Sequence, residues 1–190
     1  MNPHDLPTRR YTYDEIAAHP DEARRELHDG APIFLFAPGR ARTLRYSSVL
    51  GRVMTWLYPR GAVFHLVDWQ LDEHNSIVLE GCFFRRERAE NEKIRRADGQ
   101  CLIAAPDLAI LIFDSTSSPS VARWQHSFCA TRKVPFLWEI DVETRRFRAF
   151  QLEAGSYRTE TDLGRNESFS PTLFPNLTLS WSEIFAEDAP

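Results

Sequence analysis

One acidic residue, Glu80, stands inside the otherwise apolar segment Ile77–Phe84 (IVLEGCFF), which is predicted to be a core strand. A second apolar segment, Leu108–Phe113 (LAILIF), is predicted to be its neighbour and carries no acid between Asp107 and Asp114. A carboxylate in a buried strand costs several kcal/mol unless it is paired, protonated or bound to a metal ion. The chemistry of Glu80 therefore has to be explained.

Two interpretations of Glu80 are open on the sequence alone. In the first, its carboxylate is a metal ligand. In the second, it is a buried acid that pairs with an arginine or tilts into solvent. Glu26 presents the same choice, because it lies among other charged residues in RRELHDG, where a surface role is the plainer interpretation.

Arginine side chains gather in two stretches that could contact phosphates. The first stretch holds Arg40, Arg42 and Arg45, and the second begins with Arg85 and Arg86. Acidic residues that follow Arg86 partly cancel the second group, so a solvated face of mixed charge is the alternative. His65, His74 and His126 lack metal-ligand spacing and are predicted to have structural or surface roles.

Net charge and cysteine usage exclude several classes of protein. The chain carries a formal charge of −4, so as a whole it is not a polybasic nucleic-acid binder. Its three cysteines lie far apart without a CxxC pair, which argues against a zinc ribbon or a disulfide framework. The chain lacks a signal-peptide core and a run of about 18 apolar residues, so the sequence predicts a soluble, cytoplasmic protein without a membrane span.

Capping and periodicity predict several helices. Thr12 and Glu15 form a capping-box sequence that begins a short helix, and Pro20 suits the first turn of a second one. Asp29-Gly30 is a strong turn signal. The predicted helices run from about Tyr13 to Ala18, over Asp21–Leu27, from Leu44 to before Pro59, over Pro119–Arg132, and over Trp181–Phe185 behind a Ser180–Glu183 capping box.

The strand-like segments lie between these helices and after them, which predicts an α/β (mixed α+β) fold. Residues 37–43 are predicted to be a loop and residues 85–99 a solvated, charged segment. Residues 1–10 are predicted to be a loose lead-in, 11–186 a single domain, and 187–190 a tail. The predicted strands are Ile33–Phe36, Ala62–Leu71, Ile77–Phe84, Leu108–Phe113, Pro135–Asp141, Arg146–Glu153, Ser156–Thr161 and Leu177–Leu179.

A set of segments, in fixed order from about Tyr11 to Phe185, is similar to a known family. The segments are RYTYDEIAAHPDEARRELHDG, LDEHN, FFRRER, AAPDLAILI, VPFLWEID, FRAFQLEAGSYR and SPTLFPNLTLSWSEIF. Their order and spacing resemble the Uma-two type of restriction endonuclease-like protein, within the PD-(D/E)XK nuclease superfamily. The resemblance implies a central mixed sheet flanked by helices, with C-terminal β-hairpin strands, and a homodimer.

The resemblance also implies a Mg²⁺-dependent site that cleaves DNA. In the family pattern, an acid from the first helix, a Pro-Asp pair on the first core strand, a Glu on the second strand and a nearby Lys converge. Mg²⁺ needs several oxygen ligands, and the bound ion activates a water and offsets phosphate charge. The Lys orients that water or stabilises the developing charge.

This sequence departs from the family pattern at several of these positions. Glu26 matches the helix acid, and Glu80 stands where the Asp of Pro-Asp is expected, one methylene longer. Leu111 stands where the second-strand Glu is expected, and Gln125 where the Lys is expected. Tyr46 takes the place of a loop His. The departures at Leu111 and Gln125 remove an oxygen ligand and a positive charge.

The leading hypothesis is therefore a protein of this family with an eroded site, in which Mg²⁺-dependent DNA cleavage is weak or lost and a binding role persists. One alternative is an active metal-dependent endonuclease with a rebuilt site that uses Glu26 and Glu80 as catalytic and metal-binding residues. Another is a protein-interaction or regulatory module. DNA is the expected partner of the first two, and Mg²⁺ the cofactor if the site is active.

Overall fold

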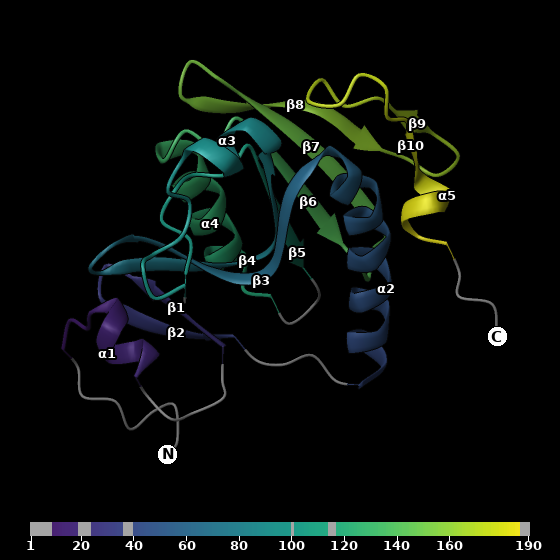
Figure 1. The fold of residues 1–190 in the computed structure, drawn as a ribbon. Coiled ribbons are helices and arrows are strands. Elements are labelled where there is room, and N and C mark those ends of the chain that lie inside the picture. The colour runs from purple at the N-terminus through teal and green to yellow at the C-terminus, as the bar shows by residue number, and fades with distance from the viewer. Residues whose placement is uncertain (1–8, 19–23, 36–39, 100, 114–116, 187–190) are drawn as a thin grey trace.

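The computed structural model describes residues 9–18, 24–35, 40–99, 101–113 and 117–186 (Figure 1), with the backbone alone for residues 24, 34–35 and 40–44. Most of the predicted lead-in, the predicted tail and Asp114 lie outside these ranges. The helices are α1 (Tyr13–Ala17), α2 (Arg40–Leu57), the 3-10 turn η2 (Tyr58–Arg60), α3 (Arg86–Asn91), α4 (Pro119–Thr131) and α5 (Trp181–Ile184). The strands are β1 (Arg24–His28), β2 (Ala31–Leu35), β3 (Gly61–Asp72), β4 (Asn75–Arg85), β5 (Leu108–Phe113), β6 (Phe136–Asp141), β7 (Arg146–Glu153), β8 (Ser156–Leu163), β9 (Ser168–Phe169) and β10 (Leu179–Ser180).

Eight of the described strands form one mixed sheet, in the order β2-β1-β4-β5-β6-β7-β8, with β3 paired on β4. The predicted neighbours, β4 and β5, pair antiparallel, with Gly81 opposite Ile110. β5 and β6 run parallel and are joined through α4, because parallel strands need a long crossover. The mixed α+β architecture that the sequence predicts is confirmed.

Helices α2 and α4 cover opposite faces of the sheet (Figure 1). Successive side chains of β5 point to opposite faces of the sheet, as in any strand. Ile110 packs in the cluster that contains Val53 and Leu57 of α2. Leu111 packs in the cluster that contains Cys129 of α4. The predicted site positions therefore belong to the α4 face.

The prediction of a second short helix over Asp21–Leu27 is wrong in its described part, because residues 24–27 belong to the strand β1. Asp29 and Gly30 both have positive φ, of 50° and 80°, and join β1 to β2 in a tight hairpin with His28 opposite Ala31. A two-residue Asp-Gly loop of this kind fixes the register of the strands on either side. Pairing with β2 and β4 outweighs the helical propensity of the sequence.

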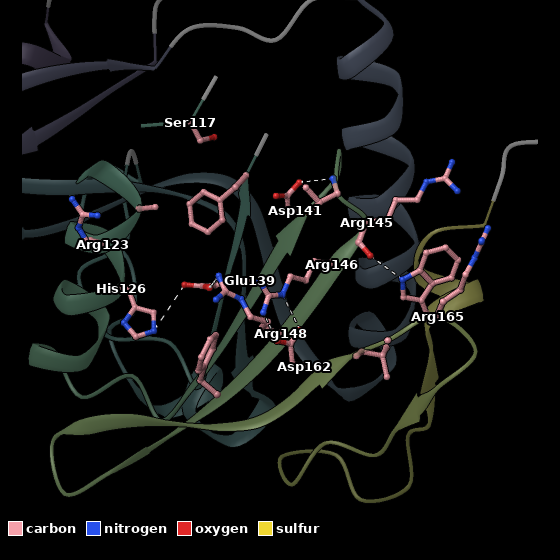
Figure 2. Close-up of a pocket in the computed structure, with 17 residues that line it drawn as sticks. Ser117, Arg123, His126, Glu139, Asp141, Arg145, Arg146, Arg148, Asp162 and Arg165 are labelled. Carbon is pink, nitrogen blue, oxygen red and sulfur yellow. Dashed lines mark hydrogen bonds and ion pairs between the residues drawn. The ribbon is translucent and has the colours of Figure 1, made fainter. Parts of the chain in front are cut away.

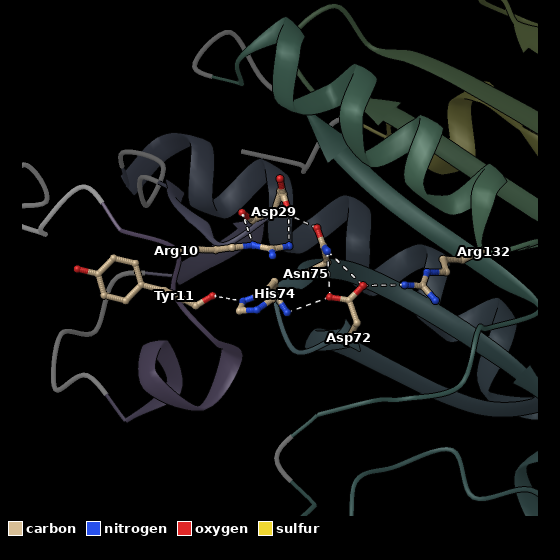
Figure 3. Close-up of polar contacts among 7 residues, drawn as sticks. All are labelled: Arg10, Tyr11, Asp29, Asp72, His74, Asn75 and Arg132. Atoms are coloured by element: carbon tan, nitrogen blue, oxygen red, sulfur yellow. Dashed lines mark hydrogen bonds and ion pairs between the residues drawn. The ribbon is translucent and has the colours of Figure 1, made fainter.

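Polar contacts around the β3–β4 turn tie three parts of the chain together (Figure 3). The Asp72 carboxylate accepts a hydrogen bond from the Asn75 amide and pairs with Arg132 beyond α4 at 3.0 Å. The Asn75 side chain accepts the Asp29 backbone N–H at 2.9 Å. Although burial opposes it, these partners hold the pKa of Asp72 below its ordinary value. The network holds β1, β4 and α4 in fixed relation.

Most other predicted elements are confirmed within one to three residues. The capping boxes at Thr12–Glu15 and Ser180–Glu183 are both formed. α2 begins at Arg40, so residues 40–43 are helical where a loop was predicted. β10 covers Leu179–Ser180, shifted from the predicted strand. Within the described part of the chain, no helix is long and apolar enough to cross a membrane.

Candidate functional site

Glu26 lies on β1, and its side chain is completely buried. The sequence placed this acid on a helix, and the structure moves it onto a strand at the side of β4. Its position is fixed by the β1–β2 hairpin and by the pairing of Leu27 with Ser76 of β4. The Glu26 carboxylate therefore faces the interior between the sheet and α4.

Both oxygens of Glu26 accept hydrogen bonds from the protein. Oε1 accepts the Val78 backbone N–H at 3.1 Å and the Gln125 amide at 2.5 Å. Oε2 lies 2.8 Å from Nε2 of His28. The His28 ring stacks on the Trp124 indole, with the ring centroids 3.4 Å apart. These contacts compensate the burial of a carboxylate, which would otherwise be costly.

Glu80 lies on β4 and is also buried. Its Oε2 accepts the Ile112 backbone N–H of β5 at 3.2 Å. The pairing of β4 with β5 spans Gly81–Phe83, so this contact lies just beyond it, where the two strands separate. In the structure, Glu80 is thus a buried acid that accepts a backbone N–H from the neighbouring strand.

The structure brings two of the predicted positions into direct contact, Glu26 and Gln125. Gln125, which stands where a Lys was expected, is buried on α4 and reaches Glu26 directly. Leu111 is fully buried on β5 and packs in the core with Cys129 and Leu137. Two of the four positions of the family pattern thus hold a neutral amide and an apolar side chain.

Magnesium is the ion that the family pattern implies at these positions. Mg²⁺ demands near-octahedral oxygen coordination at about 2.0–2.1 Å. Among the described residues, no group of three His, Cys, Asp or Glu side chains is placed so that it could hold a metal ion. Both carboxylate oxygens of Glu26 already contact protein donors, and the Leu111 side chain has no oxygen atom. The donor set is that of a hydrogen-bonded interior.

The arginines predicted from the sequence to contact nucleic acid occupy two separate places. Arg85 ends β4 and lies opposite Gly61, which follows the C-terminal end of α2. Arg45 lies near the other end of α2, about 18 Å along the helix axis at 1.5 Å per residue. Arg45, Arg85 and Arg86 are exposed, and for Arg40 and Arg42 the backbone alone is described. The two groups thus lie toward opposite ends of α2.

Sequence reasoning missed a second charged region on the α4 face. Leu111 of β5 lies opposite Glu139 of β6, Glu139 opposite Arg148 of β7, and Arg148 opposite Asp162 of β8. Side chains opposite one another in a sheet point to the same face. Glu139 interrupts the apolar run FLWEI (residues 136–140), which is the same signal that singled out Glu80.

Glu139 and Arg148 lie in a cleft of ≈ 1230 Å³ formed by β6, β7, β8 and α4 (Figure 2). The two side chains form an ion pair at 2.6 Å, and His126 of α4 lies 3.9 Å from the same carboxylate. Burial raises the pKa of Glu139, although Arg148 and Arg146 oppose the shift. Burial also lowers the pKa of His126, and the charge of Arg148 adds to this.

Comparison with known proteins identifies the family and the fold of the chain. A family model described as "Putative restriction endonuclease" (Uma2) matches residues 11–182. A crystal structure titled as a "putative nuclease belonging to DUF820", from Anabaena variabilis, is similar with a TM-score of 0.72 and 20% identity. The match covers 92% of this chain and 97% of that one, and at this identity it shows the fold. No curated protein sequence matches the chain.

Proposed function

Because the chain belongs to the Uma2 family of restriction endonuclease-like proteins, we propose that it has a nuclease fold around an eroded metal site. In this proposal, Mg²⁺-dependent DNA cleavage is lost or very weak, and a nucleic-acid-binding role persists. Restriction endonuclease-like enzymes typically depend on Mg²⁺, so the proposal turns on whether this chain can still hold that ion.

The burial and hydrogen bonding of the Glu26 carboxylate are the observation that supports the proposal most directly. Its carboxylate is completely buried and is held by Val78, Gln125 and His28. To coordinate a metal ion, Glu26 would have to give up hydrogen bonds in a site closed to water. Each buried donor left without a partner costs about 1–3 kcal/mol. Metal binding would therefore be opposed by the packing that stabilises the fold.

The residues that replace the family pattern support the same conclusion. A glutamine at position 125 satisfies Glu26 with a neutral hydrogen bond, whereas a lysine would supply the positive charge that a phosphoryl transition state needs. Leu111 fills its position with an apolar side chain in the core. Both substitutions suit a packed interior better than a hydrated metal site.

A rebuilt site is the second candidate, and one observation favours it. Glu139 lies directly opposite Leu111 on the adjacent strand, so an acid is present one strand away from where the family pattern expects it. Strands in a sheet lie about 4.8 Å apart, and Glu80 is on the other side of β5. In this candidate, Glu139 would be the third acid, and the Glu26, Glu80 and Glu139 side chains would have to move together, because they do not form a metal-binding group in the structure.

A cleavage assay tests the two candidates against each other. Supercoiled and single-stranded DNA are incubated with the protein and Mg²⁺ or Mn²⁺, beside Glu80→Ala and Glu139→Gln. The proposal expects no cleavage above the level of Glu80→Ala. Cleavage by the wild-type protein that is abolished in Glu80→Ala would reject the eroded site, and its loss in Glu139→Gln would support the rebuilt one.

The homodimer and the cytoplasmic location stay predictions. The first comes from the family resemblance, and the second from the cysteine usage. The mass of the purified protein, measured by light scattering during gel filtration, tests the dimer. A mass near 22 kDa would contradict it, since that is the mass of a single chain.

A further inference from the structure

We propose that the cleft between β6–β8 and α4, hereafter the arginine cleft, binds single-stranded nucleic acid. Its phosphate contacts would come from Arg123, Arg145 and Arg165. This proposal rests on the nucleic-acid-binding role proposed above and names the surface that performs it. That surface differs from the two arginine groups that the sequence indicated.

The three arginines come from separate parts of the chain and converge on one cleft. Arg123 lies on the first half of α4, Arg145 in the β6–β7 turn, and Arg165 just after β8. Figure 2 shows Arg123 at one end of the cleft and Arg145 and Arg165 at the other. Arg123 and Arg165 are exposed.

Between these arginines, the charged side chains on the floor of the cleft form ion pairs. Arg148 is paired with Glu139 at 2.6 Å, and Arg146 is paired with Asp162 through Nε at 2.9 Å. Among the described residues, five arginines and three acids line the cleft, which gives this lining a surplus of positive charge on a chain whose net charge is −4. Positive groups lining a cleft with low-dielectric walls focus the field and attract anions.

Aromatic side chains accompany these cations. Phe113 ends β5 and Trp181 begins α5, and both are half-buried where they line the cleft. The Arg165 guanidinium lies 5.4 Å from the Trp181 ring centroid. The Trp181 indole N–H donates to the Arg145 carbonyl at 2.8 Å, which fixes the β6–β7 turn at the cleft. Arginines interleaved with aromatic rings are typical of surfaces that hold single strands, where bases stack.

Size and shape favour an extended ligand. The cleft has a volume of ≈ 1230 Å³, whereas pockets for small molecules range from about 300 to 1,000 Å³. A single strand can pass between the separated arginines with its phosphates toward them and its bases toward Phe113 and Trp181. A stacked duplex keeps its bases inside the helix, so it could not use the aromatic side chains.

Fluorescence anisotropy with a labelled oligothymidylate in EDTA tests this proposal without any contribution from cleavage. Arg123→Ala and Arg165→Ala are compared with Arg158→Ala, a matched control on an exposed arginine of β8 that pairs with Glu153 outside the cleft. Each cleft variant is expected to bind about fivefold more weakly near 0.1 M salt and to lower the salt slope by about 0.7, as expected for one phosphate contact. Arg158→Ala should bind as the wild-type protein does.

Several outcomes would overturn the proposal. If the wild-type protein binds while both cleft variants bind equally well, the cleft is not the site, and the binding role stands. If a variant with Arg85→Ala and Arg86→Ala alone loses affinity, the surface predicted from the sequence is the site. If no nucleic acid binds, the binding role itself fails. A duplex that competes better than the single strand would overturn the class of ligand.

Discussion

Glu26 and Glu80 each satisfy a backbone N–H at a point where β4 separates from a neighbouring strand. Val78 donates to Glu26 of β1, and Ile112 donates to Glu80 on β4 itself. A buried N–H without a partner is strongly unfavourable, so a carboxylate at each gap replaces the missing carbonyl of a ladder. The two acids therefore stabilise the places where β4 separates from β1 and from β5.

We predict that Glu26→Ala lowers the free energy of unfolding by about 2–4 kcal/mol, because the Val78 N–H and the Gln125 amide lose a buried acceptor. Urea unfolding measures the change. Glu90→Ala, at an exposed position of α3, is the control and should stay within about 0.5 kcal/mol of the wild-type protein. A similar small effect at Glu26 would contradict the structural role.

The lowered pKa of His126 predicts a pH dependence of stability. Burial, and then the charge of Arg148, disfavour the protonated ring in the folded state, relative to an ordinary value of 6.5. The stability contributed by neutral His126 is therefore full above pH 6.5 and is lost as the pH falls through and below that value. Glu139, which lies beside the ring, has a pKa raised above its ordinary value of 4.5 by burial, which opposes the effect of His126 as the pH falls.

The measurement is urea unfolding at about pH 7 and pH 5. The unfolding free energy of the wild-type protein should fall more over this interval than that of His126→Asn, which cannot be protonated. His65→Asn, at an exposed position of β3, serves as the matched control and should keep the wild-type pH dependence. Equal pH dependence in His126→Asn and the wild-type protein would contradict the prediction.

Sequence reasoning reached some of these residues and missed others for a physical reason. Glu80 was found because an acid stands out in an apolar strand. Glu139 stands out in the same way, but its relation to Leu111 depends on the register of β5 against β6, which is set by the α4 crossover. The contact between Glu26 and Gln125 joins residues 99 apart in the chain, so local pattern carries no sign of it.

At the scale of elements, β1 shows how pairing overrides propensity. The segment around Glu26 contains good helix formers, and an isolated peptide of that composition would favour a helix. The Asp29-Gly30 turn was recognised from the sequence, and a strand on each side of it is its consequence. The longer elements, such as β5 and α4, were predictable because their apolar pattern extends over several residues.

Two glycines, one in α2 and one beginning β3, give opposite predictions on substitution by alanine. Gly51 lies in α2 with open space where a Cβ would stand. Gly51→Ala should therefore stabilise the protein by about 0.5–1 kcal/mol through helix propensity. At Gly61, a Cβ would meet the Phe84 carbonyl oxygen and would lie 2.7 Å from the Phe83 ring.

We therefore expect Gly61→Ala to destabilise the protein by about 1–3 kcal/mol, since neither backbone nor a buried ring can move easily. Thermal and urea unfolding of the two variants, made in parallel, give the comparison. Because the substitution is the same in both, any general effect of alanine cancels. Destabilisation by Gly51→Ala or stabilisation by Gly61→Ala would show that the junction of α2 and β3 is packed differently.

At the scale of the whole molecule, the family was predictable because its segments follow one another in order over most of the chain, and the Uma2 match over residues 11–182 confirms it. The arginine cleft was not predictable from charge, because its cations are dispersed among acids in a chain of net charge −4. In the folded chain, Arg146 and Arg148 pair with acids, and the described residues that line the cleft include more arginines than acids.

The most direct test of the closed metal site is a calorimetric titration of Mn²⁺ into the wild-type protein, beside Glu80→Ala and Glu26→Gln. Because Glu26 is held by protein donors and Leu111 offers no oxygen, the three proteins should give the same featureless titration. Saturable binding of one ion per wild-type chain that disappears in both variants would contradict the account.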